Sequence, residues 1–572
     1  MKNYRFPTLI MVVIFLSGCT NPSGNSSSGK IATDSLTVAQ GKELFIQNCS
    51  ACHNFRQRGI GPNLAGVTRM ESAEWLASFI ANSQQMISAG DPRAVSLFED
   101  YKIPMPPFPT LGEKNIASLI AYMHTFEATE SVSLNAEKAL ENPIPAPVEA
   151  SGITLVVEPY AKVPASAAQP PLARINKMLP MPGTDRLFIH DLRGKLYEII
   201  GDSVRTFLDI AKLRKDFIEK PGLGTGFGSF AFHPDFASNG LFYTTHTEPP
   251  ATAPADFAFE DSINVTLQWV LMEWRQADPS SDHFSGTGRE MMRVNMVTGI
   301  HGFQDINFNP LAKKGSSEYG LLYLGIGDGG ATGEGYGFVC HDRRRIWGSV
   351  IRINPAGNNS RNGKYGIPAD NPFVADPDTE VVKEIYVFGF RNPHRNTWDR
   401  ETGKMLITEI GQSSIEEINL AVPGGDYGWN QREGTFMIIG QGQIDSVYAL
   451  PEDDSRGNFI YPVAQFDHDE GNAISGGYVY RGKNITLLQG KYLFGDVVNG
   501  RLMMVSADDF HLGRQATIAE LSLEVEGKKQ NLIEVTGNKR VDLRFGQDQE
   551  GELYIFTKAD GKIWKITDAL KQ

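Results

Sequence analysis

The sequence predicts a multidomain chain in which a small all-α domain precedes a large all-β domain, built as a six-bladed β-propeller. At 572 residues and 63.0 kDa, the chain is too long for one ordinary core. Apolar residues at helical spacing occur before residue 128, whereas the later sequence is a series of short strand patterns and glycine turns. Related hairpin patterns recur along that later part, and the patterns near its two ends match.

The first residues predict export. Lys2 and Arg5 flank the start of a short apolar run, and small residues then lead to Cys19. The stretch "LSGC" resembles a bacterial lipobox, after which Cys19 would be the lipidated first residue of the mature protein. A transmembrane anchor is the alternative, but the apolar run is too short to span a bilayer. We expect a signal peptide over 1–18, a flexible tether over 19–35, and a membrane-anchored lipoprotein in the periplasm or at the cell surface.

Charge and cysteine content exclude other classes of protein. The formal net charge of −13 disfavours nucleic acid as a partner, because the phosphate backbone would be repelled. The chain has four cysteines: Cys19 is assigned to lipid, Cys49 and Cys52 form a close pair, and Cys340 is isolated. This inventory does not describe a disulfide scaffold.

The close cysteine pair belongs to a C-x-x-C-H motif. In c-type haem attachment, the thiols of Cys49 and Cys52 would add to the porphyrin vinyl groups and His53 would bind the iron. A redox disulfide or half of a zinc site is the alternative for a bare C-x-x-C. Neither alternative requires the adjacent histidine, and no second Cys/His cluster completes a zinc site.

The surroundings of this motif favour haem. Apolar residues at helical spacing predict helices around it, and "GPNL" follows the motif at 61–64. The helices are expected over 37–53, 72–83 and 112–126. Together these features resemble class I cytochrome c over 36–128.

That resemblance implies a methionine as the second axial ligand of the iron, in the loop before the last helix. The stretch "YKIPMPPFPTLG" offers Met105, and Met70 and Met86 are the competing methionines. Ligation by histidine and methionine raises the haem potential and closes the iron to substrate. Such a haem transfers electrons, and a haem enzyme acting on peroxide would need the position that Met105 fills.

Residues 129–172 predict a linker, because they are rich in proline and alanine and show little periodicity. The propeller is expected over 173–570. These about 400 residues would supply six large blades.

Repeated strand patterns support the propeller. A hairpin pattern at 185–199 has a near copy at 551–566, and half-repeats lie at 320–330 and 403–412. Matching ends fit a closed ring in which the first and last blades meet. A β-sandwich is the alternative, but it does not explain the similarity between the two ends.

Several stretches of this region resemble the soluble, quinoprotein-type sugar dehydrogenase family, and they occur in the family's order. They include "GSFAFHPDFASNGLFYTT", "LYLGIGDGG", "EIYVFGFRNPHR" and "TEIGQSSIEEINLAVPGGDYGWN". The resemblance implies a six-bladed propeller that uses pyrroloquinoline quinone (PQQ) and calcium to oxidise a sugar or a related alcohol.

The resemblance also implies site residues. His301 stands where the family has its general base, and Asp328 matches the acid that orients this histidine. Arg391 and Asn392 match the pair that contacts the quinone, where an arginine could stabilise charge on the reduced cofactor. The structural alternatives are a histidine capping a strand, an ordinary turn aspartate and a surface turn.

Calcium is a hard ion that prefers oxygen ligands. In the family two successive backbone carbonyls bind the calcium next to PQQ, and Gly411 and Gln412 match them. Glu417 and Tyr427 match a second, structural calcium site.

The sequence departs from the family at positions that would contact PQQ. The glutamine expected near Gly224 is missing, and a lysine expected to meet a PQQ carboxylate is replaced at 497–498. Lys539 and Arg540 only loosely match a pair of arginines, and Arg501 is a nearby substitute cation. PQQ carries three carboxylates, so these losses would weaken its binding.

Two functions follow. The first is a dehydrogenase that oxidises a sugar or alcohol at PQQ and passes electrons to its own haem and then to a respiratory acceptor. The fusion of both units in one chain would raise their effective concentration. The second is a propeller that has lost PQQ and binds carbohydrate or protein beside an electron-transfer domain.

Overall fold

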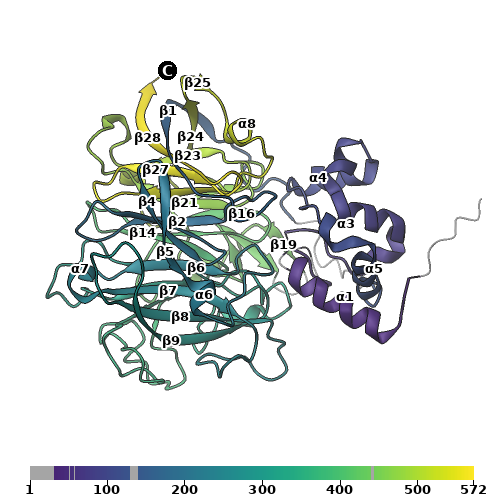
Figure 1. The fold of residues 1–572 in the computed structure, drawn as a ribbon, viewed down its shortest axis with the longest axis horizontal. Coiled ribbons are helices and arrows are strands. Elements are labelled where there is room, and N and C mark those ends of the chain that lie inside the picture. The colour runs from purple at the N-terminus through teal and green to yellow at the C-terminus, as the bar shows by residue number, and fades with distance from the viewer. Residues whose placement is uncertain are drawn as a thin grey trace, which may run out of the picture.

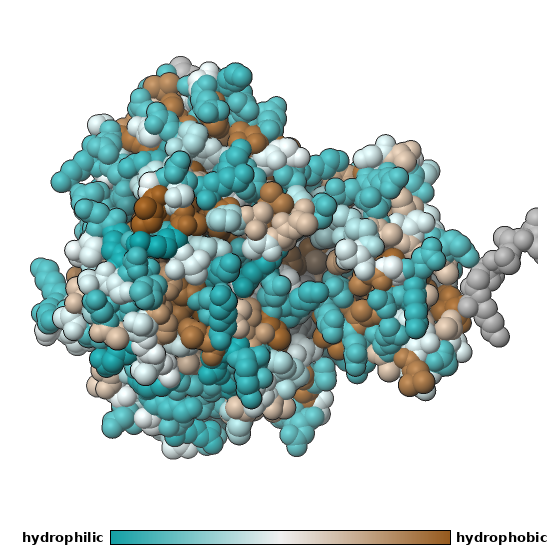
Figure 2. Space-filling model, in the orientation of Figure 1, coloured by the Kyte–Doolittle hydropathy of each residue, from teal (hydrophilic) through white to brown (hydrophobic). Residues whose placement is uncertain are grey.

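The computed structural model describes residues 31–50, 52–56, 58, 60–128, 139–439 and 443–571. The expected signal peptide and Cys19 lie outside the described residues. Figure 1 shows a group of helices on one side of a larger β-domain, and Figure 2 shows two lobes whose visible surface is mostly hydrophilic. None of the helices within the described ranges is long and apolar enough to cross a bilayer.

The helical lobe confirms the predicted all-α domain. Its helices are α1 (Ser35–Asn48), α2 (Val67–Met70), α3 (Ala73–Ser88), α4 (Pro92–Tyr101) and α5 (Gly112–Met123). The three predicted helices correspond to α1, α3 and α5, whereas α4 was not predicted. Helices α1 and α5 cross closely at Gly41, where an added Cβ would lie 1.9 Å from the Ser118 carbonyl oxygen. Glycine is therefore required at this crossing.

The large lobe is a ring of six blades. In chain order, the first blade consists of β2 (Ile175–Pro180), β3 (Leu187–Asp191), β4 (Lys195–Ile200) and β5 (Ser203–Asp209), and the second of β6 (Phe227–Phe232), β7 (Leu241–Glu248), β8 (Leu267–Gln276) and β9 (Gly286–Met296). The third consists of β10 (Phe303–Phe308), β11 (Leu322–Ile326), β12 (Ser349–Ile353) and β13 (Ile385–Phe388), and the fourth of β14 (Pro393–Trp398), β15 (Met405–Glu409), β16 (Ile415–Leu420) and β20 (Ala464–Asp467). The fifth consists of β21 (Ile474–Val479), β22 (Lys491–Asp496), β23 (Leu502–Ser506) and β24 (Ala519–Val525). The sixth is β26 (Leu543–Gln547), β27 (Leu553–Thr557), β28 (Lys562–Lys571) and β1 (Glu149–Lys162). Each first strand contacts the first strand of the next blade, and the contact between β2 and β26 closes the ring.

Smaller elements decorate the ring. They are a three-stranded sheet of β17 (Arg432–Glu433), β18 (Phe436–Ile439) and β19 (Gln443–Tyr448), the strand β25 (Lys528–Lys529), and the short helices α6 (Ile210–Leu213), α7 (Phe236–Asn239) and α8 (Leu532–Thr536).

Strand β1 corrects the predicted linker. Residues 149–162 were assigned to the linker, but they form the outer strand of the sixth blade, antiparallel to β28 and parallel to β24. Leu155 and Val157 of β1 are fully buried in the core of that blade. The matching ends of the sequence therefore do meet, and an additional strand from before the propeller completes the last blade.

The sequence repeats coincide with the second strands of different blades. The stretches at 320–330 and 403–412 contain β11 and β15, and the two similar hairpins contain β3 with β4 and β27 with β28. Each second strand pairs with the first strand of its blade. The turn that follows a second strand therefore lies at the same level of the ring in every blade.

Candidate functional site at the domain interface

A cavity of about 430 Å³, here called the funnel, lies on the face of the propeller where the second strands end. The propeller side of its wall is built mainly from residues just before first strands and from turns just after second strands, and residues 99–103 of the helical lobe line it as well. The lining residues at these positions are Arg174, His301, Asn392, Ala473 and Asp542 before first strands, and Gly411, Val497 and Lys558 after second strands. The fold therefore gathers short segments from different blades into one site.

His301 and Asp328 form a buried pair at the funnel wall. His301 precedes β10 in a left-handed conformation with φ 54°, which non-glycine residues seldom adopt. Its Nδ1 lies 2.6 Å from Oδ1 of Asp328, which follows β11. With Nδ1–H donating to this carboxylate, Nε2 of His301 carries the lone pair.

The electrostatics keep both groups in the required charge states. Burial, together with nearby Arg391, lowers the pKa of His301, so the imidazole is neutral at neutral pH. Burial alone would raise the pKa of Asp328, but His301 and Arg391 hold it below the ordinary value. The pair is therefore a neutral imidazole oriented by a carboxylate, which is an arrangement suited to a general base.

Arg391 and Asn392 lie between β13 and β14, and both side chains line the funnel. Their backbone N–H groups donate to Oε1 of buried Glu409, at 2.6 Å and 2.9 Å. This double contact fixes the turn. The Oδ1 atom of Asn392 is buried without a hydrogen-bond partner, so it can accept a hydrogen bond from a bound polar group.

The expected calcium position at Gly411 and Gln412 does not fit an ion in this arrangement. Nη1 of Arg391 donates to the Gly411 carbonyl oxygen at 2.6 Å, and its Nε donates to Oε1 of Gln412 at 2.9 Å. The Gly411 carbonyl oxygen that calcium would need is therefore already bound by the Arg391 guanidinium.

The second expected calcium position does not fit either. Glu417 accepts hydrogen bonds from the backbone of Gly434 at 2.5 Å and from Asn419 at 2.9 Å. The Tyr427 hydroxyl donates to the Leu420 carbonyl oxygen. No cluster of three or more acidic, histidine or cysteine side chains suited to a metal occurs in the part of the chain that the structure describes. The catalytic roles proposed below therefore do not involve calcium.

A second cavity, of about 620 Å³, contains the haem-attachment motif. It is lined by Cys49, Cys52, His53 and Met105 of the helical lobe. His53 Nδ1 lies 3.0 Å from the Pro62 carbonyl oxygen, so Nδ1–H donates there and Nε2 is left to bind iron. Burial lowers the pKa of His53, which favours the neutral form that a metal requires.

The three candidate methionines differ in position. Met105 lines this cavity, and its backbone carbonyl accepts a hydrogen bond from Ser83 Oγ at 2.6 Å. Met70 is 62% exposed, and Met86 lies in α3 away from the cavity lining. The geometry thus places Met105 in the same cavity as His53.

The two lobes meet where these cavities adjoin. Arg56 Nη1 donates to the Glu334 carbonyl oxygen at 2.8 Å, and Gln412 Nε2 donates to the Arg58 carbonyl oxygen at 3.2 Å. A small cavity of about 30 Å³ between them is lined by Cys52 and His53 of one lobe, and by His301, Asp328 and Arg391 of the other. The haem motif and the buried His–Asp pair therefore face one space.

The structure shows what lies at two positions where the sequence departs from the family. The site near Gly224 is filled by an amide from another blade, because Nε2 of Gln304 lies 2.4 Å from where a Gly224 Cβ would be. Arg501 does not replace the missing lysine, since it pairs with Glu470 and Glu520 and does not line the funnel. The funnel residues Gln304 and Lys558 were not predicted from the sequence. Their position beside repeated strand ends was the available signal.

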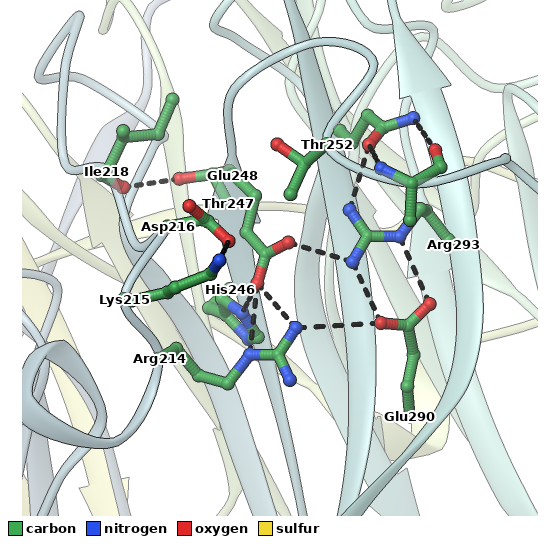
Figure 3. Close-up of polar contacts among 12 residues, drawn as sticks. Arg214, Lys215, Asp216, Ile218, His246, Thr247, Glu248, Thr252, Glu290 and Arg293 are labelled. Atoms are coloured by element: carbon green, nitrogen blue, oxygen red, sulfur yellow. Dashed lines mark hydrogen bonds and ion pairs between the residues drawn. The ribbon is translucent and has the colours of Figure 1, made fainter.

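A buried ionic network lies at the end of β7 (Figure 3). The Glu248 carboxylate accepts hydrogen bonds from Arg214 at 2.7 Å, Arg293 at 2.7 Å and His246 at 2.9 Å. Glu290 also pairs with Arg293. None of these residues lines the funnel, so we assign the network a structural role.

Comparisons with known proteins agree with this two-part organisation. A family model described as Glucose / Sorbosone dehydrogenase matches residues 176–565, and a Cytochrome c model matches residues 38–127.

Individual relatives are distant. Quinoprotein glucose dehydrogenase B of Acinetobacter calcoaceticus is 28% identical over 254 residues, which is 41% of this chain and 46% of that protein. The HIPL1 protein of Arabidopsis thaliana is 25% identical over 390 residues, or 60% of this chain and 53% of that protein. The chain spans about half the length of these curated relatives. The PQQ-bound form of aldose sugar dehydrogenase from Streptomyces coelicolor is 20% identical, with a TM-score of 0.45, covering 73% of this chain and 98% of that structure.

Proposed function

Because this chain belongs to the glucose/sorbosone dehydrogenase family and carries a cytochrome c domain before the propeller, we propose that it is a quinohaemoprotein dehydrogenase. It oxidises an aldose sugar or a related alcohol with PQQ bound in the funnel. Electrons then pass to its own covalent haem and from there to a respiratory acceptor. We further propose that the protein is exported and held at a bacterial membrane through lipid on Cys19.

One observation carries this proposal. The small cavity at the interface is lined both by Cys52 and His53 and by His301, Asp328 and Arg391. A haem bound to the first pair and a redox cofactor beside the second group would be close neighbours. The names of relatives such as quinoprotein glucose dehydrogenase B support the choice of PQQ as that cofactor.

The residues of the funnel suit an anionic, polar cofactor. Arg391 and Asn392 present a guanidinium and an unpartnered amide oxygen to the cavity. Bound PQQ would supply the two-electron acceptor for hydride from the substrate carbon. The chain's own contribution is to orient the substrate, to exclude water and to accept the hydroxyl proton.

His301 is the residue that would take this proton. Its Nε2 is the free nitrogen, because Nδ1–H is held by Asp328. Proton transfer from the substrate hydroxyl to Nε2 leaves an imidazolium, and the Asp328 carboxylate stabilises that charge. Hydride then leaves the carbon that bears this oxygen, so the alcohol or hemiacetal loses a proton from oxygen and a hydride from carbon, and a C=O bond forms.

The cytochrome lobe would carry the electrons away one at a time. Cys49 and Cys52 would hold the haem, and His53 and Met105 would be the axial ligands. Arg56 and Gln412 hold this lobe against the funnel through direct hydrogen bonds. A docked position shortens the path for electrons between the two cofactors.

A binding function is the second candidate. It is favoured by Arg391, which occupies the Gly411 carbonyl that the family resemblance assigns to calcium. The human Hedgehog-interacting protein, whose name describes binding to another protein, is 27% identical over 401 residues. In that case the propeller would bind carbohydrate or protein without PQQ.

Haem reduction separates the two candidates. Purified haem-containing protein is incubated with PQQ, with and without Ca²⁺, and the haem absorption bands are followed after an aldose is added. We expect reduction in the parent and its loss in His301→Ala. His283→Ala, at an exposed histidine whose side chain is 70% accessible, is the matched control. Haem reduction in His301→Ala at the parental rate would refute the assigned base, and no PQQ-dependent reduction under any condition would favour the binding function.

A further inference from the structure

Lys558 is a buried cation that forms no hydrogen bond or close ion pair within the described residues, although the charge of Asp542 acts on it. It follows β27, in the turn of the sixth blade that corresponds to Asp328 after β11 and Gly411 after β15. The residue is 6% exposed and lines the funnel. Among the described residues, no hydrogen-bond acceptor or carboxylate lies within bonding distance of its Nζ atom.

Other cations surround Lys558 in the funnel wall. Arg544 lies in β26, and it donates hydrogen bonds to two neutral acceptors, Asn176 Oδ1 at 3.0 Å and the Leu543 carbonyl oxygen at 2.7 Å. Arg174 precedes β2, and its hydrogen bonds also go to backbone carbonyls, including Thr225 at 3.0 Å; its one carboxylate partner, Glu219, lies 3.8 Å away and is 40% exposed. These two arginines and Lys558 are all more than nine-tenths buried.

Negative charge at this wall is scarce. Asp542 is the buried acid that lines the same part of the funnel; Arg540 binds it at 3.0 Å, and its single charge also acts on Lys558 and Arg544. Burial, with Arg544 as the next cause, holds the pKa of Lys558 well below its ordinary value. Burial likewise lowers the pKa of Arg544 to about 9. Arg174, Arg540, Arg544 and Lys558 thus outnumber the acids Asp542 and Glu219 beside them, and such an excess of buried positive charge is unfavourable unless a bound anion compensates it.

We propose that Lys558, Arg544 and Arg174 form the site that binds the carboxylates of PQQ in this protein. They replace the lysine that the sequence lacks at 497–498, where Val497 and Val498 present apolar side chains to the funnel. This inference rests on the proposed function.

The arrangement favours the cofactor over an acidic sugar as the source of the carboxylates. The three cations come from separate elements, before β2, within β26 and after β27. A ligand with one carboxylate would leave most of this charge uncompensated. PQQ carries three carboxylates on a rigid frame, so it can meet several cations at once.

Equilibrium dialysis of the full-length, haem-containing protein tests the site without measuring turnover. The probes are PQQ, phenanthroline dione as an o-quinone without carboxylates, and D-glucuronate as an acidic sugar. The variant is Lys558→Met, and Lys528→Met at an exposed lysine of β25 is the matched control. We expect the Kd for PQQ to rise about 30-fold or more in Lys558→Met, since a buried charged contact is lost. The control and the affinity for phenanthroline dione should not change.

The other outcomes are distinct. Equal PQQ binding by the parent and Lys558→Met would overturn this inference and leave the proposed function intact. Failure of the parent to bind PQQ at all would overturn the proposed function as well. Lys558-dependent binding of D-glucuronate, with PQQ affinity unaffected, would assign the cations to an acidic substrate and so refute the cofactor site.

Thermal melting provides a second test, in which the change in Tm should have one sign without PQQ and the other sign with PQQ. Without PQQ, Lys558→Met should melt at a higher temperature than the parent, because a buried cation without a partner is removed. With saturating PQQ, the parent should gain more in Tm than the variant. A variant that melts lower than the parent without PQQ would show that Lys558 stabilises the fold itself, which contradicts the proposal.

Discussion

Replacement of Glu248 by glutamine tests how strongly the buried network of Figure 3 supports the propeller. Glu248 is fully buried and accepts hydrogen bonds from Arg214, Arg293 and His246. Glutamine keeps the size but removes the charge, and Arg293, which is 1% exposed, keeps Glu290, which is 21% exposed, as its carboxylate partner. Breaking a buried ion pair costs about 3–5 kcal/mol, so we expect the free energy of unfolding to fall by about this amount.

Equilibrium urea denaturation followed by tryptophan fluorescence measures this loss. We expect the midpoint to fall by about 1 M or more in Glu248→Gln. Glu290→Gln is the control, because Glu290 pairs with the same arginine but is 21% exposed, and we expect a cost of about 1 kcal/mol. Equal midpoints for Glu248→Gln and the parent, or an equal loss in both variants, would refute the reasoning.

The same network makes the stability of the propeller depend on pH. Burial alone would raise the pKa of Glu248, but hydrogen bonds from His246, Arg214 and Arg293 hold it well below its ordinary value of 4.5. A carboxyl with a depressed pKa contributes stability above its unfolded-state pKa and loses it as the pH falls. The difference in stability between the parent and Glu248→Gln should therefore be complete at neutral pH and shrink below about pH 4.5.

Three further predictions concern the two redox sites. Asp328→Asn should slow aldose-dependent haem reduction by roughly two to four orders of magnitude, which is the contribution of a general base. Because Asp328 raises the pKa of His301, the variant should also shift the acid limb of the pH–rate profile to lower pH. An unshifted limb would contradict the pairing of these two residues. Gly61→Ala should lower the haem content per protein in absorption spectra, because a Cβ there would lie 2.3 Å from Cε1 of His53, and full haem content would show that the ring can move. Met105→Leu should retain covalent haem but lower its reduction potential in spectroelectrochemistry, and an unchanged potential would reject this ligand.

Local patterns in the sequence were sufficient for most of the fold. Helical spacing of apolar residues located α1, α3 and α5, and alternation located the hairpins of the first and last blades. Helix α4 was missed because its start is marked only by Asp91 as the N-cap and Pro92 at the first position. Strand β1 was missed because prolines and alanines flank it, although Ile153, Leu155 and Val157 alternate as a half-buried strand would.

The site was less accessible to sequence reasoning. His301 and Asp328 were found through motifs of the family, and the structure brings them to 2.6 Å. Lys558 was missed because a single lysine in a turn has no local pattern, and its burial depends on how the blades close. The contact of Arg391 with the Gly411 carbonyl could not be predicted either, because it joins two loops through a side-chain conformation.

Strand β1 also has a consequence for how the chain matures. It pairs with β28, whose residues lie about 400 positions later in the chain, so the sixth blade is completed only after β28 has been synthesised. Residues 49–53, by contrast, emerge early. Porphyrin attachment can therefore precede completion of the sixth blade, and the helical lobe can fold before the propeller that it contacts is complete.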